Sequence, residues 1–130
     1  MHKEIIRTDR AWNSPSPISQ ATRFGNLVFT SGQGPMDPRT GKIAEGGFKQ
    51  EIRQALDNLT AVLEAAGTSR ENVLKAMVFL ADMDNFSAYN EVWVEYFPTD
   101  RPARTAIQAG RMPRGFSVEI EVVACIPTPD

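Results

Sequence analysis

Arginine, glutamate and hydroxyl side chains are the candidate reactive groups of this sequence, because the commonest catalytic side chains are nearly missing. The chain has one histidine, His2, and one cysteine, Cys125. A Ser-His-Asp or Cys-His catalytic group needs an imidazole that its neighbours hold, and His2 follows the first residue. A zinc site needs several cysteine and histidine ligands, and here the one of each lies far from the other. Any catalysis must therefore use carboxylates, arginines, hydroxyls, amides and backbone groups.

Arg104 and Glu119 are the two charged residues whose positions suggest a function. Arg104 begins a predicted strand after a proline-containing turn. An arginine fork there could bind a carboxylate through two parallel charge-assisted hydrogen bonds, although position alone favours a solvated surface arginine. Glu119 lies in the last predicted strand, on the same side as Glu121. A carboxylate on a buried strand needs a partner or a function, whereas one that faces water needs neither.

Two further motifs are incomplete. The segment Ser31-Gly32-Gln33-Gly34-Pro35 lacks the Gly-Lys-Ser/Thr ending of a phosphate-binding loop and the third glycine of the dinucleotide fingerprint. It predicts instead a tight turn at the end of a strand, whose backbone amides could face a ligand. Carboxylates alone could bind Mg²⁺ or Ca²⁺, but Asp82-Met83-Asp84 lacks the rest of an EF-hand loop.

The spacing of apolar residues and the positions of glycine and proline predict the helices and strands that carry these residues. Apolar residues at helical spacing, followed by Gly67, predict a first helix, and Asp84 and Pro98 are expected to cap and end a second one. Asp37-Pro38-Arg39-Thr40-Gly41 reads as a turn, and the proline-containing stretch 13–17 as an extended loop that lies over another element. The aromatic side chains of the second helix are expected in the core. The expected helices are at 48–66 and 84–97, and the expected strands at 27–30, 73–80, 104–109 and 117–126, with a weaker strand signal at Ile5-Ile6.

Composition indicates one globular domain over residues 1–130. Hydrophobic residues make up 42% of the chain and charged residues 23%, so the chain can bury a core and disorder is not expected. The net charge of −2 gives no reason to expect a nucleic-acid or membrane partner. No apolar run approaches the roughly 20 residues that span a bilayer, and no signal peptide is recognisable. With a single cysteine, the expected compartment is the cytoplasm.

The strand at 73–80 implies a partner for the sheet. It is apolar on both faces, and two helices can cover only one face of such a sheet. The chain has no third layer left to cover the other face. We therefore expect an α+β protein that associates with copies of itself.

The order of motifs resembles the RidA/YjgF family over nearly the whole chain. The first part of the match contains the strand-ending turn and the proline turn, and the later parts contain both helices and the closing strands. The matching segments are Thr30-Ser31-Gly32-Gln33, Asp37-Pro38-Arg39-Thr40-Gly41, Gln54-Ala55-Leu56-Asp57-Asn58-Leu59, Leu63-Glu64-Ala65-Ala66-Gly67, Val78-Phe79-Leu80-Ala81-Asp82-Met83, Phe86 with Asn90-Glu91-Val92, Pro102-Ala103-Arg104-Thr105, Arg111-Met112-Pro113 and Val118-Glu119-Ile120-Glu121.

This resemblance implies a fold, an activity and a site. The implied fold is chorismate-mutase-like, a mixed sheet with two helices on one face, assembled as a trimer with clefts between subunits. The implied activity is hydrolysis of reactive enamines and imines to 2-oxo acids and ammonia, without a metal or organic cofactor. By position, Arg104 corresponds to the arginine that binds the substrate carboxylate, and Glu119 to the glutamate that positions or activates water. The remaining substrate-binding positions are Ser31, Gly32, Asn90, Ile18 and Thr105.

Two positions depart from the family pattern. Many deaminating members have a tyrosine where this chain has Ile18, and some have a cysteine where it has Ala106. Loss of the tyrosine hydroxyl removes a positioning contact and makes that wall apolar, which implies a different substrate or a weaker activity. The alternative function is therefore a non-catalytic trimer that binds small carboxylic acids. An endoribonuclease, as reported for some relatives, gains little support from an acidic chain with one histidine.

Overall fold

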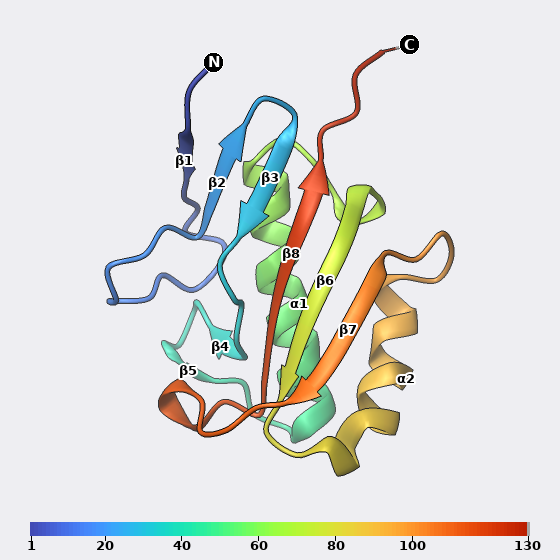
Figure 1. The fold of residues 1–130 in the computed structure, drawn as a ribbon. Helices are drawn as coiled ribbons and strands as arrows, with labels where there is room; N and C mark the ends of the chain where they lie inside the picture. The colour runs from blue at the N-terminus through green and yellow to red at the C-terminus, as the bar shows by residue number, and fades with distance from the viewer. Residues whose placement is uncertain (130) are drawn as a thin grey trace.

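A six-stranded mixed sheet forms the centre of the computed structural model, which describes residues 1–129 (Figure 1). The strand order is β1-β2-β3-β8-β6-β7, and only β6 and β7 run parallel. A separate hairpin pairs β4 with β5. The strands are β1 (Glu4–Ile6), β2 (Ala21–Phe24), β3 (Leu27–Thr30), β4 (Met36–Asp37), β5 (Lys42–Ile43), β6 (Val73–Leu80), β7 (Ala103–Gln108) and β8 (Val118–Cys125). The helices are α1 (Phe48–Ala65) and α2 (Phe86–Tyr96), with short 3₁₀ turns η1 (Arg70–Asn72), η2 (Met83–Asn85) and η3 (Pro113–Gly115).

Helix α1 confirms the prediction made from apolar spacing. Its buried face includes Ile52, Leu56, Leu59 and Leu63, which recur at three- and four-residue intervals. Gly67 follows the helix with a φ of 90°, and its N–H donates to the carbonyl of Glu64. A residue with a side chain would be strained in this left-handed conformation, so glycine ends the helix there.

Helix α2 begins later than the sequence indicates. Asp84 was expected as its N-cap, but Asp84 lies inside η2, and the helix starts at Phe86. The side chain of Asp82 accepts a hydrogen bond from Asp84 N–H at 2.9 Å, so Asp82 caps the 3₁₀ turn that precedes the helix. Two aspartates in three residues offer two capping positions, and the 3₁₀ turn uses the first. The helix ends before Pro98, as predicted.

Both helices cover the same face of the sheet (Figure 1). On β8, Val118, Ile120 and Val122 face the helices and are buried, whereas Glu119 and Glu121 face the other way. This alternation confirms the expected pattern of the last strand. The α+β class and the two-helix layer are therefore as predicted.

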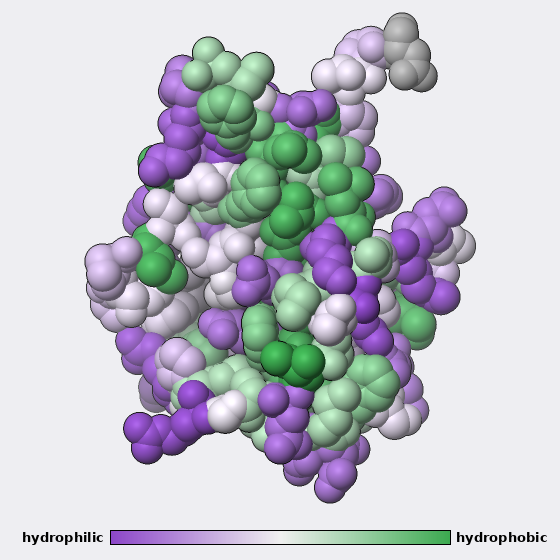
Figure 2. All heavy atoms as spheres, viewed as in Figure 1, coloured by the Kyte–Doolittle hydropathy of each residue, from purple (hydrophilic) through white to green (hydrophobic). Residues whose placement is uncertain are grey.

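The face of the sheet without helices is partly apolar. Leu27 and Phe29 of β3 are 38% and 44% exposed, and Ile107 of β7 is 44% exposed. Figure 2 shows apolar atoms gathered over β3 and β8 on this face. Large side chains of this kind that lie together on a surface commonly mark an interface.

The strands β2, β4 and β5 were not predicted. Strands β4 and β5 have two residues each, too short to show alternation, and they flank the predicted turn at Asp37–Gly41. That turn is confirmed, with Gly41 at a φ of 72°. The described residues contain no helix that is both long and apolar enough to cross a membrane.

Candidate functional site

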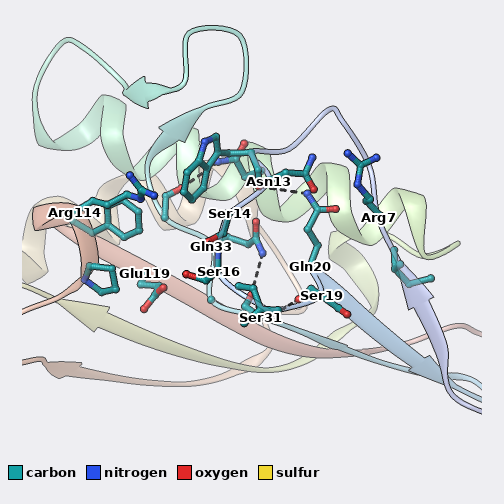
Figure 3. A pocket seen from close by; sticks show the side chains of 18 of the residues that line it. Arg7, Asn13, Ser14, Ser16, Ser19, Gln20, Ser31, Gln33, Arg114 and Glu119 are labelled. Carbon is teal, nitrogen blue, oxygen red and sulfur yellow. Dashed lines mark hydrogen bonds between the residues drawn. The ribbon is translucent and has the colours of Figure 1, made fainter.

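A cavity of about 560 Å³ lies between the N-terminal loop and the end of the sheet at which β8 begins (Figure 3). The proline-containing stretch of the sequence forms part of its wall, which confirms that this loop lies over another element. The cavity brings together four of the predicted site residues. They are Ile18, Ser31, Gly32 and Glu119.

Glu119 is a half-buried carboxylate near the start of β8. Burial raises the pKa of Glu119 above its ordinary value, and the charge of Glu121 adds to the effect. Among residues 1–129, no side chain or backbone group donates a hydrogen bond to it. Its oxygens therefore remain available to a ligand or a water molecule.

The turn after β3 is fixed against both β8 and the N-terminal loop. Gln33 N–H donates to Ile120 O at 2.8 Å, and Ile120 N–H donates back at 3.0 Å. Ser31 N–H donates to Gln20 O at 2.9 Å, and the Ser31 hydroxyl donates to Ser19 O at 2.7 Å. Gly32 lies between these contacts, and its N–H has no acceptor within the described chain. This arrangement leaves a free backbone donor next to Glu119.

Asn58 of α1 holds the next part of the turn. Its side-chain amide donates to Gly34 O at 3.1 Å and to Met36 O at 2.8 Å. Asn58 is 2% exposed, and Gln54 donates to its side-chain oxygen at 3.1 Å. Because buried amides are costly to leave unpaired, this network fixes the shape of the cavity wall.

Arg104 lies on the opposite side of the sheet from Glu119. Its guanidinium carbon is 5.4 Å, 5.5 Å and 5.0 Å from the ring centroids of Phe86, Tyr89 and Trp93 in α2. We call these three residues the aromatic cluster. Within residues 1–129 Arg104 has no carboxylate partner. Cation–π contacts use the ring faces, so the N–H edges of the guanidinium stay free for a planar anion.

A shallow cavity next to the aromatic cluster contains Arg104 together with Asn90. Tyr89 is fully buried, and its hydroxyl has no hydrogen-bond partner in the described chain. Burial raises the pKa of Tyr89, while the positive charge of Arg104 opposes the rise. The second helix thus contributes core side chains, as predicted, and the same side chains hold Arg104.

One chain does not bring Arg104 and Glu119 together. Arg104 pairs with Ala76, a residue of β6 that faces the helices, whereas Glu119 pairs with Phe79, which faces the other way. Thr105 lies on the face without helices, where its hydroxyl accepts a hydrogen bond from Lys75 Nζ at 2.9 Å. The predicted site residues therefore fall into two groups on one chain, with Thr105 outside both cavities.

The sequence did not point to Trp12 or Arg114 as site residues, although both border the cavity of Glu119. Arg114 follows Pro113 in η3, and its φ is 56°. Its guanidinium carbon lies 4.9 Å from the ring centroid of Trp12. A proline–arginine–glycine turn is a weak signal, and 102 positions of sequence separate the two side chains.

The fold and the two cavities define a small α+β protein with a carboxylate, Glu119, in one cavity and an arginine, Arg104, in the other. Residues 8–126 match the sequence model of the family described as Endoribonuclease L-PSP. The chain belongs to this family, which includes the RidA proteins.

Three similar proteins illustrate the match. A RutC family protein of Pyrococcus horikoshii is 46% identical over 94% of this chain and 97% of its own length. A 2-iminobutanoate/2-iminopropanoate deaminase of Capra hircus is 43% identical over 94% of this chain and 89% of its own. The solved structure of E. coli TdcF with bound serine has a TM-score of 0.89 and 36% identity, over 94% of this chain and 98% of that one. Imine deaminase activity is thus represented in the family.

Proposed function

We propose that this protein hydrolyses 2-imino acids, and the enamines in equilibrium with them, to 2-oxo acids and ammonia. Water adds to the imine carbon, the C–N bond breaks, and the two hydrogens of the water leave on nitrogen as ammonia. The observation that carries the proposal is Glu119, a half-buried carboxylate without a protein partner beside the free N–H of Gly32. The relative named as a 2-iminobutanoate/2-iminopropanoate deaminase supports the same chemistry.

In this proposal Arg104 binds the substrate carboxylate. The aromatic cluster leaves the edges of its guanidinium free, and a carboxylate can accept two parallel hydrogen bonds there. Asn90 borders the same cavity and supplies an amide for the substrate. Once Arg104 binds the substrate carboxylate, the imine is held in one orientation. Much of the entropy that the reaction requires is therefore lost on binding and not in the chemical step.

Glu119 acts in this proposal as the group that orients and deprotonates the attacking water. Its pKa is raised by burial, which makes the ionised form a stronger base near neutral pH. The N–H of Gly32 lies on the same wall and serves as a substrate donor. The hydroxyl of Ser31, whose hydrogen is donated to Ser19 O, can accept a hydrogen bond from the substrate. An imine is already electrophilic, so an oriented water and a bound carboxylate suffice without a metal.

The complete site forms between two copies of the chain in a homotrimer. Arg104 and Glu119 lie on opposite faces of one sheet, so one substrate reaches both only if a neighbouring copy supplies one of them. The apolar side chains of the face without helices support such an association. Thr105, on that face, would then lie at the interface, from which it can reach the substrate.

Ile18 makes one wall of the cavity apolar. Its side chain is 58% exposed on the single chain, and it stands where many deaminases have a tyrosine. We expect it to favour substrates with an apolar or longer side chain over the smallest imines. Restoring a hydroxyl in Ile18→Tyr should raise the rate on the imine of alanine.

The test couples a pyridoxal-phosphate enzyme that releases 2-aminoacrylate, or its four-carbon homologue, to the purified protein. Formation of the 2-oxo acid should accelerate with the wild type and not with Arg104→Ala. Arg39→Ala is the matched control, because Arg39 is an exposed arginine that pairs with Asp37 away from both cavities. Equal rates with and without the wild-type protein would overturn the proposal.

The binding-module alternative predicts a different pattern. In that case 2-oxo acids bind to the wild type, and less tightly to Arg104→Ala, while neither protein accelerates hydrolysis. Calorimetry with 2-oxobutanoate measures this binding without any turnover. Gel filtration tests the assembly, since a monomer at micromolar concentration would contradict a shared site.

A further inference from the structure

Three arginines of the chain have no acceptor among the described residues. The sequence contains ten arginines, and seven of them donate to a carboxylate, a hydroxyl or a backbone carbonyl. The three without an acceptor are Arg104, Arg111 and Arg114. Arg104 and Arg114 are each held by aromatic rings, and each borders a cavity. Arg114 therefore shares the arrangement that makes Arg104 an anion-binding group.

The backbone at Arg114 has an uncommon conformation, which fixes the direction of the side chain. Its φ of 56° lies in the left-handed region, which a residue with a side chain seldom adopts. The turn that holds this conformation begins at Pro113 and ends at Gly115, whose φ is 70°. Such strain persists where the surrounding structure requires it, and it is concentrated at functional sites.

The cavity offers Arg114 no internal counter-charge. Glu119 is the only carboxylate among its lining residues, and no ion pair joins it to Arg114 within residues 1–129. Arg7, the other cation of the lining, already pairs with Asp9. In the view of Figure 3, Arg114 and Glu119 lie at one end of the cavity and Arg7 at the other. An unpaired cation thus borders the space next to the proposed reacting group.

We propose that Arg114 and Trp12 form a second anion-binding subsite, which recognises the distal carboxylate of a substrate derived from a dicarboxylic amino acid. The inference rests on the proposed function, because Arg104 is assigned there to the carboxylate next to the imine carbon. Arg114 donates from the edges of its guanidinium, while Trp12 contacts the face. The hydroxyls of Ser14 and Ser16 border the same space and can donate to the anion.

The size of the cavity supports a ligand longer than the smallest imino acids. A volume of about 560 Å³ lies within the range typical of sites for drug-sized ligands, roughly 300 to 1,000 Å³. Arg114 and Glu119 lie at the same end of the cavity (Figure 3), so a five-carbon diacid whose imine carbon lies at Glu119 can place its second carboxylate at Arg114.

The experiment compares two imines of equal chain length, made in place by flavin-dependent oxidation of glutamate and of 2-aminopentanoate. Both contain five carbons, and only the first has a distal carboxylate. The kcat/KM ratio of diacid to neutral imine is measured for the wild type, Arg114→Gln and Arg111→Gln. Arg111 is the matched control, an arginine of the same loop without an acceptor that does not border the cavity.

The ratio should fall by about tenfold or more in Arg114→Gln, since a charge-assisted hydrogen bond of ordinary strength is lost. It should fall less in Arg114→Lys, which keeps the charge, and remain unchanged in Arg111→Gln. The proposal is overturned if Arg114→Gln lowers both rates equally, or if it lowers neither. Circular dichroism of each variant identifies a loss of fold.

A binding measurement separates this inference from the deaminase proposal. Calorimetry compares the affinity for 2-oxoglutarate with that for 2-oxopentanoate, and no turnover is needed. If no imine is hydrolysed but the preference for 2-oxoglutarate depends on Arg114, the subsite stands and the proposed activity fails. If imines are hydrolysed and the diacid has no Arg114-dependent advantage in either assay, the activity stands and the subsite fails.

Discussion

Gly32 lies so close to Glu119 that a methyl group on its Cα would be 2.7 Å from both Cγ and Cδ of the glutamate. The backbone of Gly32 is not left-handed, so the need for glycine here comes from this contact and not from its φ. Glu119 can move aside, because its carboxylate is the end of a flexible side chain. The contact between Gly32 and Glu119 therefore determines where the carboxylate lies. It has a smaller effect on the free energy of unfolding.

Gly32→Ala should separate activity from stability. The added methyl group displaces the Glu119 carboxylate from the turn, and we expect a loss of kcat of about 100-fold, within the usual range for a general base. The melting temperature should change by no more than about 2 °C, because little buried surface is lost. Deaminase assays and thermal unfolding measure the two effects.

Gly34→Ala is the comparison variant for Gly32→Ala, because it should lower the stability of the fold. A methyl group there would come within 2.5 Å of the Phe116 ring, a bulky side chain that is 6% exposed. Since overpacking a buried ring costs about 1 to 3 kcal/mol, this variant should lose stability. If Gly32→Ala unfolds as readily as Gly34→Ala, the relationship between Gly32 and Glu119 is structural and not functional.

The raised pKa of Glu119 predicts that Glu119→Gln becomes more stable, relative to wild type, as pH rises. The native state holds the proton of Glu119 more tightly than the unfolded chain does, so native stability falls between the ordinary pKa of 4.5 and the raised one. Glutamine has no proton to lose and removes this cost. Melting temperatures measured from pH 4 to pH 7 should show the difference between the two proteins growing with pH. A difference that shrinks over this interval would contradict the direction of the shift.

The pH dependence of kcat/KM should show the same ionisation of Glu119. Only the charged form of Glu119 can accept a proton from water, so kcat/KM should fall as pH drops below the raised pKa. Glu121→Gln removes the neighbouring charge that helps raise the pKa of Glu119, and it should move this acidic limb to lower pH. An acidic limb that stays in place in this variant would argue against Glu119 as the titrating group.

Tyr89→Phe should stabilise the protein. The Tyr89 hydroxyl is buried and has no partner in the described chain, and an unsatisfied buried hydroxyl costs about 1 to 3 kcal/mol. Phenylalanine keeps the ring that faces Arg104, so the free energy of unfolding should rise by about 1 kcal/mol. Urea unfolding at fixed protein concentration measures it. A destabilised variant would mean that the hydroxyl has a partner in the assembled protein.

Trp93→Leu should weaken substrate binding through Arg104. Trp93 has the shortest of the three ring contacts with the guanidinium, and leucine fills part of the volume without a ring face. We expect KM to rise about fivefold, with a smaller effect on kcat, as follows from a cation–π contact worth roughly 1 kcal/mol. Trp93→Phe, which restores a ring face, should recover most of the loss. If both variants lose kcat alone, the aromatic cluster does not position Arg104.

The fold could be predicted where the signal is local. The apolar spacing and Gly67 define α1, and the alternation of β8 separates its buried side from the side of Glu119. The prediction that Asp84 caps α2 was wrong because Asp82, two residues earlier, caps the 3₁₀ turn that precedes the helix. Strand β2 and the two-residue strands β4 and β5 depend on pairing partners, which no short window contains.

The site could be predicted only in part, for a physical reason. The order of motifs identified Arg104 and Glu119 as candidate site residues. The face of the sheet on which each of them lies depends on the register of β7 and β8 against β6. The sequence of β7, Ala-Arg-Thr-Ala-Ile-Gln, does not alternate between apolar and polar residues, so it does not reveal which side of that edge strand Arg104 occupies. The contact of Trp12 with Arg114 joins the two ends of the chain, and it follows from the tertiary fold alone.

Mixing two inactive variants tests whether Arg104 and Glu119 act from different copies. Arg104→Ala and Glu119→Gln should each be inactive alone. In a closed trimer assembled at random from equal amounts, about a quarter of the sites combine an intact Arg104 from one copy with an intact Glu119 from its neighbour. Co-expression, with a different tag on each variant, should therefore restore about a quarter of the wild-type activity.

Two controls make this result decisive. Each variant mixed with a differently tagged copy of itself must stay inactive, and native mass spectrometry must show that mixed trimers have formed. Within one chain the two residues lie on opposite faces of the sheet, and each variant retains only one of them. A restored site must therefore take one residue from each of two copies. If mixed trimers form and activity does not return, the two residues do not meet across an interface, and the assignment of Arg104 to the substrate carboxylate is wrong.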